Sequence, residues 1–158
     1  MTIETLMEDL EAQAFFAKLP RKISENQKIL SAIITVGVKD PITLHLTSPL
    51  VGKDFIAGFT LRNNKPAWSV ITFNSLISLD TIGLDAEFLE TELSLLELVE
   101  AKLFQVPLTI KLRYGVSRTG MILQIRGGLF EFRSAGIIQW FTVAALESLI
   151  VENLSNLA

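Results

Sequence analysis

The chain has 158 residues, of which 49% are hydrophobic and 20% charged, and its formal net charge is −3. This composition predicts one folded domain, or two very small ones with a shared core, and excludes disordered and low-complexity proteins. With no cysteine and one histidine, His45, disulfides, iron–sulfur clusters, thiol nucleophiles and zinc ribbons are excluded. No apolar stretch reaches the ~20 residues of a bilayer helix, and the first residues are acidic where a signal peptide is basic, so we expect a soluble, cytoplasmic protein.

The first forty residues are predicted to be helical. Apolar side chains recur three or four positions apart over residues 2–18, without Gly or Pro, which predicts an amphipathic helix that ends before Pro20. Ser24 and Gln27 have the spacing of a capping box, and Gly37 supplies a stop. We therefore predict a second helix over residues 25–36, although its Ile-Ile-Thr-Val end also suits a strand.

From residue 41 the apolar period changes to two, which is typical of half-buried strands. Residues 85–104 contain no Gly or Pro and are rich in Leu and Glu, so they predict a central helix with a wide apolar face. The period of two then returns from residue 107. The predicted organisation is N-terminal helices over 1–40, a first small barrel over 41–82, a central helix over 83–105, a second small barrel over 106–151 and a tail over 152–158.

The two strand-rich stretches resemble each other in order. Three pairs of segments match: 41–46 with 107–112, 58–61 with 120–123, and 72–79 with 142–149, where both end in Leu-x-Ser-Leu. A unit of about 40 residues has the size of an SH3-like or Sm-like barrel, so the pattern predicts a duplicated barrel held by shared helices. Coincidence between segments rich in Leu and Ile is the alternative. The predicted fold class is thus a β-dominated α+β protein with two SH3/Sm-like barrel repeats, an N-terminal helical segment and a bridging helix.

Two motifs connect the chain to a known pattern. Residues 6–13 read Leu-Met-Glu-Asp-Leu-Glu-Ala-Gln, and residues 142–146 read Thr-Val-Ala-Ala-Leu. The chain resembles an uncharacterised bacterial family, common in actinobacteria, whose members open with a Leu-Phe-x-Asp-Leu-Glu-Ala-Gln helix followed by two such barrels. The family pattern has Pro-Leu where Val143 and Ala144 stand, and residues 71–76 of the first copy also lack the proline. The resemblance implies the two-barrel architecture and no known activity.

No motif for catalysis is present. Gly52 and Lys53 lack the remaining residues of a phosphate-binding loop, and the sequence has no serine-hydrolase, zinc-protease or dinucleotide fingerprint. The alternation around His45 directs that side chain away from the apolar strand face, to solvent. We therefore expect no catalytic residue, no cofactor and no bound metal.

Charge is uneven along the chain. Residues 80–104 carry seven acidic side chains against Lys102 alone, and residues 105–135 carry five basic ones against Glu131. The acidic group fits the solvent face of the central helix. The basic group predicts an RNA or anion patch on the second barrel, formed by Lys111, Arg113, Arg118 and Arg126. Pairing of these cations with the acidic helix, or simple solvation, is the alternative, and the sequence pI of 5.2 is low for a dedicated nucleic-acid domain.

The leading hypothesis is a non-enzymatic protein-binding or scaffolding module that contacts a protein partner, including a second copy of itself in a homo-oligomer, and no membrane. The candidate docking residues lie on the first helix: Leu6, Leu10, Phe15 and Phe16. RNA binding through the second barrel is the alternative hypothesis. A third hypothesis is a secretion-chaperone-like α/β protein, which requires a terminal helix over residues 143–156.

Overall fold

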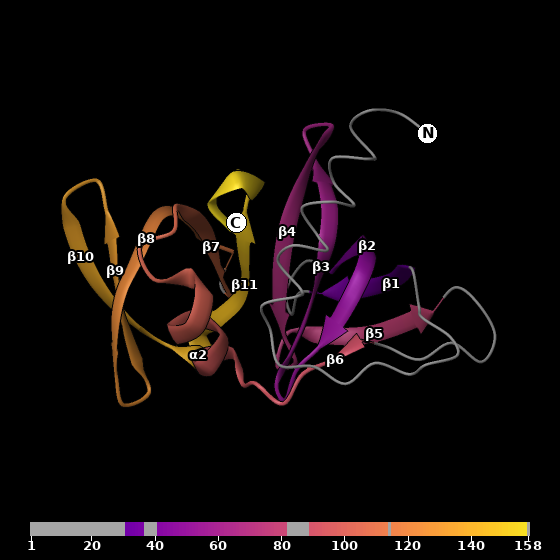
Figure 1. Ribbon diagram of the computed structural model, residues 1–158, viewed down its shortest axis with the longest axis horizontal. Helices are drawn as coiled ribbons and strands as arrows, with labels where there is room; N and C mark the ends of the chain where they lie inside the picture. Colours follow the sequence, from indigo (N-terminus) through magenta and orange to yellow (C-terminus); the bar gives the residue numbers. More distant parts are fainter. Residues whose placement is uncertain (1–30, 37–40, 82–88, 114, 158) are drawn as a thin grey trace.

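The computed structural model describes residues 31–36, 41–81, 89–113 and 115–157 (Figure 1). The predicted helix over residues 2–18 lies outside these ranges. The candidate docking residues lie there too: Leu6, Leu10, Phe15 and Phe16.

A mostly antiparallel sheet dominates the described residues, which confirms the β-dominated prediction. The first half contains β1 (Ser31–Val36), β2 (Ile42–Val51), β3 (Phe55–Arg62), β4 (Lys65–Thr72) and β5 (Leu76–Thr81). The second half contains β7 (Leu108–Leu112), β8 (Ser117–Arg126), β9 (Leu129–Ser134), β10 (Ile137–Thr142) and β11 (Leu146–Val151). The strands follow one path, β10-β9-β8-β7-β11-β4-β3-β2-β1-β5, and β6 (Leu89–Glu90) pairs with β2.

The sheet is open, so the structure does not support two closed barrels. One continuous path of hydrogen-bonded strands passes through both halves, with β10 at one end and β5 at the other. Figure 1 shows the two halves side by side, with β4 and β11 adjacent in the middle. Within each half the strands nevertheless follow the same order, which is 4-3-2-1-5 when each half is numbered along the chain.

The central helix is shorter than predicted. Its helical residues are α2 (Leu95–Leu98), which begins at a Ser94–Glu97 capping box, and the π-helical turn η1 (Val99–Leu103). Residues 89–93 run along the first half instead: β6 pairs with β2, Thr91 N–H donates to the Val51 carbonyl, and Lys53 N–H donates to the Leu93 carbonyl. These hydrogen bonds satisfy the backbone outside a helix, so the helix prediction is wrong for residues 89–93.

Two other predicted helices are wrong in their described parts. Residues Ser31–Val36 form β1, which lies between β2 and β5, so the β-branched run outweighs the capping signal before it. The terminal helix required by the secretion-chaperone hypothesis is absent, because residues 143–157 form the 3-10 turn η2 (Val143–Ala145), β11 and the 3-10 turn η3 (Leu154–Leu157).

The matched segments do not all fall on equivalent strands. Residues 41–46 begin β2, the second strand of its half, whereas 107–112 contain β7, the first strand of the other half. Residues 58–61 and 120–123 are displaced by one strand in the same way. Only the segments 72–79 and 142–149 occupy equivalent positions, each passing from the fourth strand to the fifth.

One large core joins the halves. Buried aromatic side chains of the first half, including Phe55, Phe59 and Trp68, belong to the same cluster as Phe130 and Phe132 of the second half. The helical segment contributes its apolar face to this cluster through Leu95, Leu98, Val99 and Leu103. A shared core was expected from the sequence, because a unit of about 40 residues buries little surface alone.

Candidate functional site

The two halves join along β4 and β11, and we call this contact the seam. Val70 lies opposite Leu149, and Trp68 lies opposite Val151. All four side chains are buried. At the end of β4, the Thr72 hydroxyl donates to the Leu146 carbonyl over 3.0 Å. The seam is therefore a strand pairing between distant parts of the chain, with these four side chains in the core.

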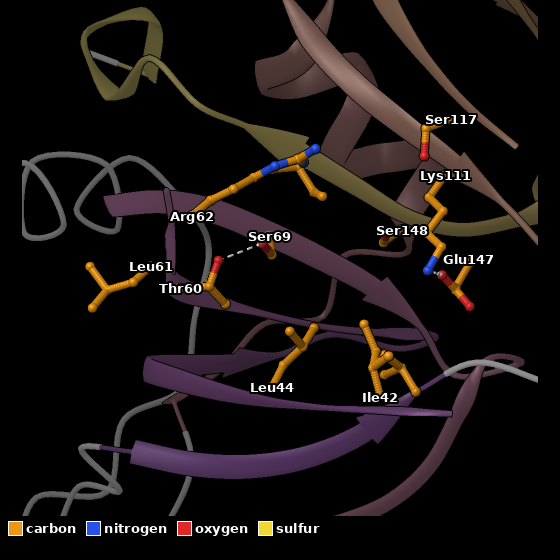
Figure 2. Close-up of a pocket in the computed structure, with 12 residues that line it drawn as sticks. Ile42, Leu44, Thr60, Leu61, Arg62, Ser69, Lys111, Ser117, Glu147 and Ser148 are labelled. Atoms are coloured by element: carbon orange, nitrogen blue, oxygen red, sulfur yellow. Dashed lines mark hydrogen bonds and ion pairs between the residues drawn. The ribbon is translucent and has the colours of Figure 1, made fainter. Parts of the chain in front are cut away.

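A groove of about 320 Å³ lies over the seam (Figure 2). Its apolar side chains include Ile42 and Leu44 of β2, and Lys111 and Glu147 line it from the second half. Most of the groove's lining is aliphatic carbon and hydroxyl, and no histidine is among the residues that line it. This composition suits contact with an apolar side chain better than chemistry on a substrate.

Two pairs of polar groups that line the groove contact each other. Lys111 Nζ lies 2.9 Å from Glu147 Oε2, and the Thr60 and Ser69 hydroxyls are 2.9 Å apart. The residues that line the groove include serine and threonine hydroxyls but no histidine to act as a base. The groove therefore offers no pair of a hydroxyl nucleophile and an imidazole. Among the residues that the structure describes, no group of three or more His, Cys, Asp or Glu side chains could hold a metal ion.

The four predicted patch residues are not brought together. Lys111 is paired with Glu147 of β11. The Arg113 guanidinium donates to the carbonyl of Ala144 in the η2 turn over 3.4 Å. Two of the four cations are thus held by neighbouring groups of the second half.

The remaining two cations lie far apart along one strand. Arg118 is near the start of β8 and opposite Ile110, whereas Arg126 ends β8. The Arg126 guanidinium lies over the Trp140 ring, with its central carbon 5.9 Å from the ring centroid. RNA binding therefore stays a prediction to which the observed geometry adds nothing.

Strand β10 carries three exposed apolar side chains. Within the described ranges, β10 pairs with β9 and with no other strand. Ile137 is 63% exposed, Ile138 46% and Trp140 43%. We call this strand, with these three side chains, the β10 edge.

The other end of the sheet is also apolar. Strand β5 pairs with β1 alone in the part of the chain that the structure describes. Its Ile77 is 57% exposed, and Leu76 and Leu79 are half-buried. We call this strand the β5 edge.

His45 is exposed on β2, as predicted.

The described residues contain no helix that is long and apolar enough to cross a membrane. Comparison of the chain with protein-family models, curated proteins and solved structures found no match.

The β10 edge was not identified from the sequence, although a signal for it exists. Ile137 and Ile138 follow directly after Gly136, and Trp140 follows two positions later, so apolar side chains occupy consecutive positions of one strand. A strand that is apolar on both faces is expected to be covered on both. Exposure of these side chains departs from that expectation and makes β10 a candidate interaction surface.

Proposed function

We propose that this protein is a non-enzymatic protein-binding module, built from two related SH3/Sm-like units, which binds a partner strand along its β10 edge. The observation that carries the proposal is that β10 has only one paired edge among the described residues, and that Ile137, Ile138 and Trp140 on it are exposed. An added strand satisfies the free backbone groups of such an edge, and the exposed side chains supply apolar contact.

The sequence of β10 lacks the features that normally protect an edge. Native sheets place Lys, Pro, a bulge or very short strands at their edges, because an open edge pairs with other chains. Strand β10 reads Ile-Ile-Gln-Trp-Phe-Thr over six residues, with no charge and no proline, and its pairing with β9 runs without a register shift. Retention of an unprotected apolar edge supports a strand-binding role.

The repeat part of the proposal is supported by details of register. Strand β5 pairs with β1 through a bulge between Leu76 and Ser78. Strand β11 pairs with β7 through a bulge between Leu146 and Ser148, at the same places of the Leu-x-Ser-Leu pattern. Agreement of the strand order and of an irregularity within it favours duplication over coincidence.

The turns between the third and fourth strands agree as well. Asn63 and Asn64 both have positive φ between β3 and β4, and Ala135 and Gly136 both have positive φ between β9 and β10. Such two-residue turns match the twist of the strands they join. The same proposal includes membership of the actinobacterial two-barrel family that the sequence resembles.

The test is photo-crosslinking in the producing cell. A photoreactive residue at Ile137 lies on the β10 edge, and the same residue at Val116, which is exposed in the β7–β8 turn, is the matched control. We expect light-dependent protein adducts of discrete mass from position 137 and none from position 116. Absence of any protein adduct at position 137 would overturn the proposed function.

A further inference from the structure

The two ends of the sheet are formed by the same two strand types that pair with each other in the seam. In the seam, β4, the fourth strand of the first half, pairs with β11, the fifth strand of the second half. The corresponding strands are β10, the fourth of the second half, and β5, the fifth of the first half. These two strands are the ends of the sheet.

The strands of the seam, β4 and β11, are more buried than the corresponding strands at the ends of the sheet, β10 and β5. The last six residues of β4 are all buried, because β11 covers their edge. The six residues of β10 include four exposed ones, Ile137, Ile138, Trp140 and Thr142. Strand β11 has five buried residues out of six, whereas none of the four β5 side chains described is buried.

From this we infer that the β10 edge binds the β5 edge of a second copy of the chain, head to tail, in the antiparallel register of the seam. The inference rests on the proposed function and names the partner of that site. The occupant is a second copy because the contact continues an interface that the chain itself forms, with the same two strand types.

The seam also specifies the register between copies. Residues 72–79 correspond to 142–149, so Val70 corresponds to Trp140 and Leu149 corresponds to Leu79. Because Leu149 lies opposite Val70 in the seam, Leu79 of one copy is expected opposite Trp140 of the next. The same correspondence places Ser78 opposite Phe141, Asp80 opposite Gln139, and Thr81 opposite Ile138.

Such a contact joins two different surfaces, so it leaves one free β10 edge and one free β5 edge on every pair. A head-to-tail contact therefore propagates until it closes into a ring or continues as a filament. A contact between two β10 edges would instead stop at a dimer. The arrangement of the ends thus distinguishes this assembly from an ordinary symmetric pair.

Engineered cysteines test the register directly, because the chain has none of its own. Opposed residues of antiparallel strands have Cα atoms about 4.5–5.5 Å apart, within disulfide range. In the double variant Asp80→Cys/Gln139→Cys, mild oxidation is expected to produce a ladder of covalent multiples of 17.5 kDa. Each single variant is expected to stay a single chain on the same denaturing gel.

The seam supplies a matched control. Ile150 lies opposite Ser69, the internal pair that corresponds to Asp80 and Gln139. The variant Ser69→Cys/Ile150→Cys is expected to form its disulfide within one chain, without a ladder. A dimer from Gln139→Cys alone would mean a symmetric β10 contact and would overturn the inference, as would internal closure of the Asp80→Cys/Gln139→Cys variant.

Mass in solution gives a second, independent readout. Light scattering of the unmodified protein is expected to give a multiple of 17.5 kDa, and Trp140→Glu is expected to lose assembly and give a single chain. Leu129→Glu is the control, because Leu129 is 41% exposed but lies on β9, which is paired on both sides. An unmodified protein that remains a single chain at every concentration overturns the inference.

The crosslinking experiment separates the two proposals. Adducts at position 137 that contain only further copies of this chain support both. Adducts that contain only a different protein retain the proposed function and overturn the second-copy inference. Absence of protein adducts overturns both.

Discussion

Lys111 Nζ lies 2.9 Å from Glu147 Oε2, and the Glu147 side chain is only 5% exposed. Glu147 occupies the bulge where β11 leaves its regular pairing with β7, next to the seam. A carboxylate at this depth requires a charged partner, because desolvation of an unpaired charge is costly. Lys111, a residue that the sequence favours for RNA binding, therefore has a structural partner within its own half.

Removal of the lysine charge is expected to destabilise the fold. Lys111→Met leaves the buried Glu147 carboxylate without its cation, and we expect the free energy of unfolding to fall by about 2 kcal/mol. Urea denaturation measures this change. Lys53→Met, at an exposed turn, is the control and is expected to change stability by less than about 0.5 kcal/mol.

The double variant gives the stricter form of this prediction. Lys111→Met combined with Glu147→Leu replaces both charges by apolar groups, so most of the lost stability is expected to return. A double variant that is as unstable as Lys111→Met alone would contradict a role for charge pairing and indicate a packing role for the lysine stem.

Gly120→Ala is expected to disturb the bend of β8. Strand β8 passes from pairing with β7 to pairing with β9 at this residue, and an added Cβ would lie 2.0 Å from the Arg133 carbonyl oxygen. Backbone must move to admit the methyl group, at a cost of about 1–3 kcal/mol. Thermal unfolding measures the loss. Gly128→Ala is the matched control, because nothing lies within 4 Å of a Cβ there.

Asp54 is expected to anchor the short helix to the first half. Its Oδ1 accepts from the Leu95 N–H over 2.7 Å, at the first turn of α2. Asp54→Ala leaves this donor without its acceptor and is expected to cost about 1 kcal/mol, as for a lost helix cap. Asp54→Asn retains an acceptor oxygen and is expected to cost less. Equal losses from both variants in denaturant titrations would contradict this account.

The seam and the β5 edge are expected to differ in their sensitivity to truncation. Leu149→Ala removes a buried side chain and is expected to lower the free energy of unfolding by about 2–5 kcal/mol. Leu79→Ala truncates the corresponding half-buried residue of β5 and is expected to cost at least about 1 kcal/mol less. Both are measured in the Trp140→Glu background, so that association does not contribute.

Local patterns predicted those elements whose hydrogen bonds are made with near neighbours. The apolar period of two from residue 41 predicted β2, and its return from residue 107 predicted β7. Local helix propensity gave wrong predictions where pairing with a strand from elsewhere in the chain determines the structure. Residues 31–36 are a strand because β2 and β5 flank them, and residues 89–93 are extended because β2 supplies their backbone partners.

The docking residues predicted from the sequence, Leu6, Leu10, Phe15 and Phe16, lie outside the described residues, and the β10 edge was not among them. From composition and motifs we predicted a non-enzymatic protein, and neither shows which surface of the sheet stays exposed. Ile137 and Trp140 read as ordinary core positions of a strand, and only the position of β10 at the end of the sheet shows otherwise. Strand order depends on contacts between residues far apart in sequence, which periodicity does not encode.

The seam also constrains how the chain is made. Thr72, at the end of β4, hydrogen-bonds to Leu146, which is separated from it by 74 positions. During synthesis the first half therefore emerges from the ribosome long before β11 is available to protect β4. Throughout that interval the edge of β4 that pairs with β11 has no partner strand from β11, and exposed edges of this kind favour aggregation of nascent chains.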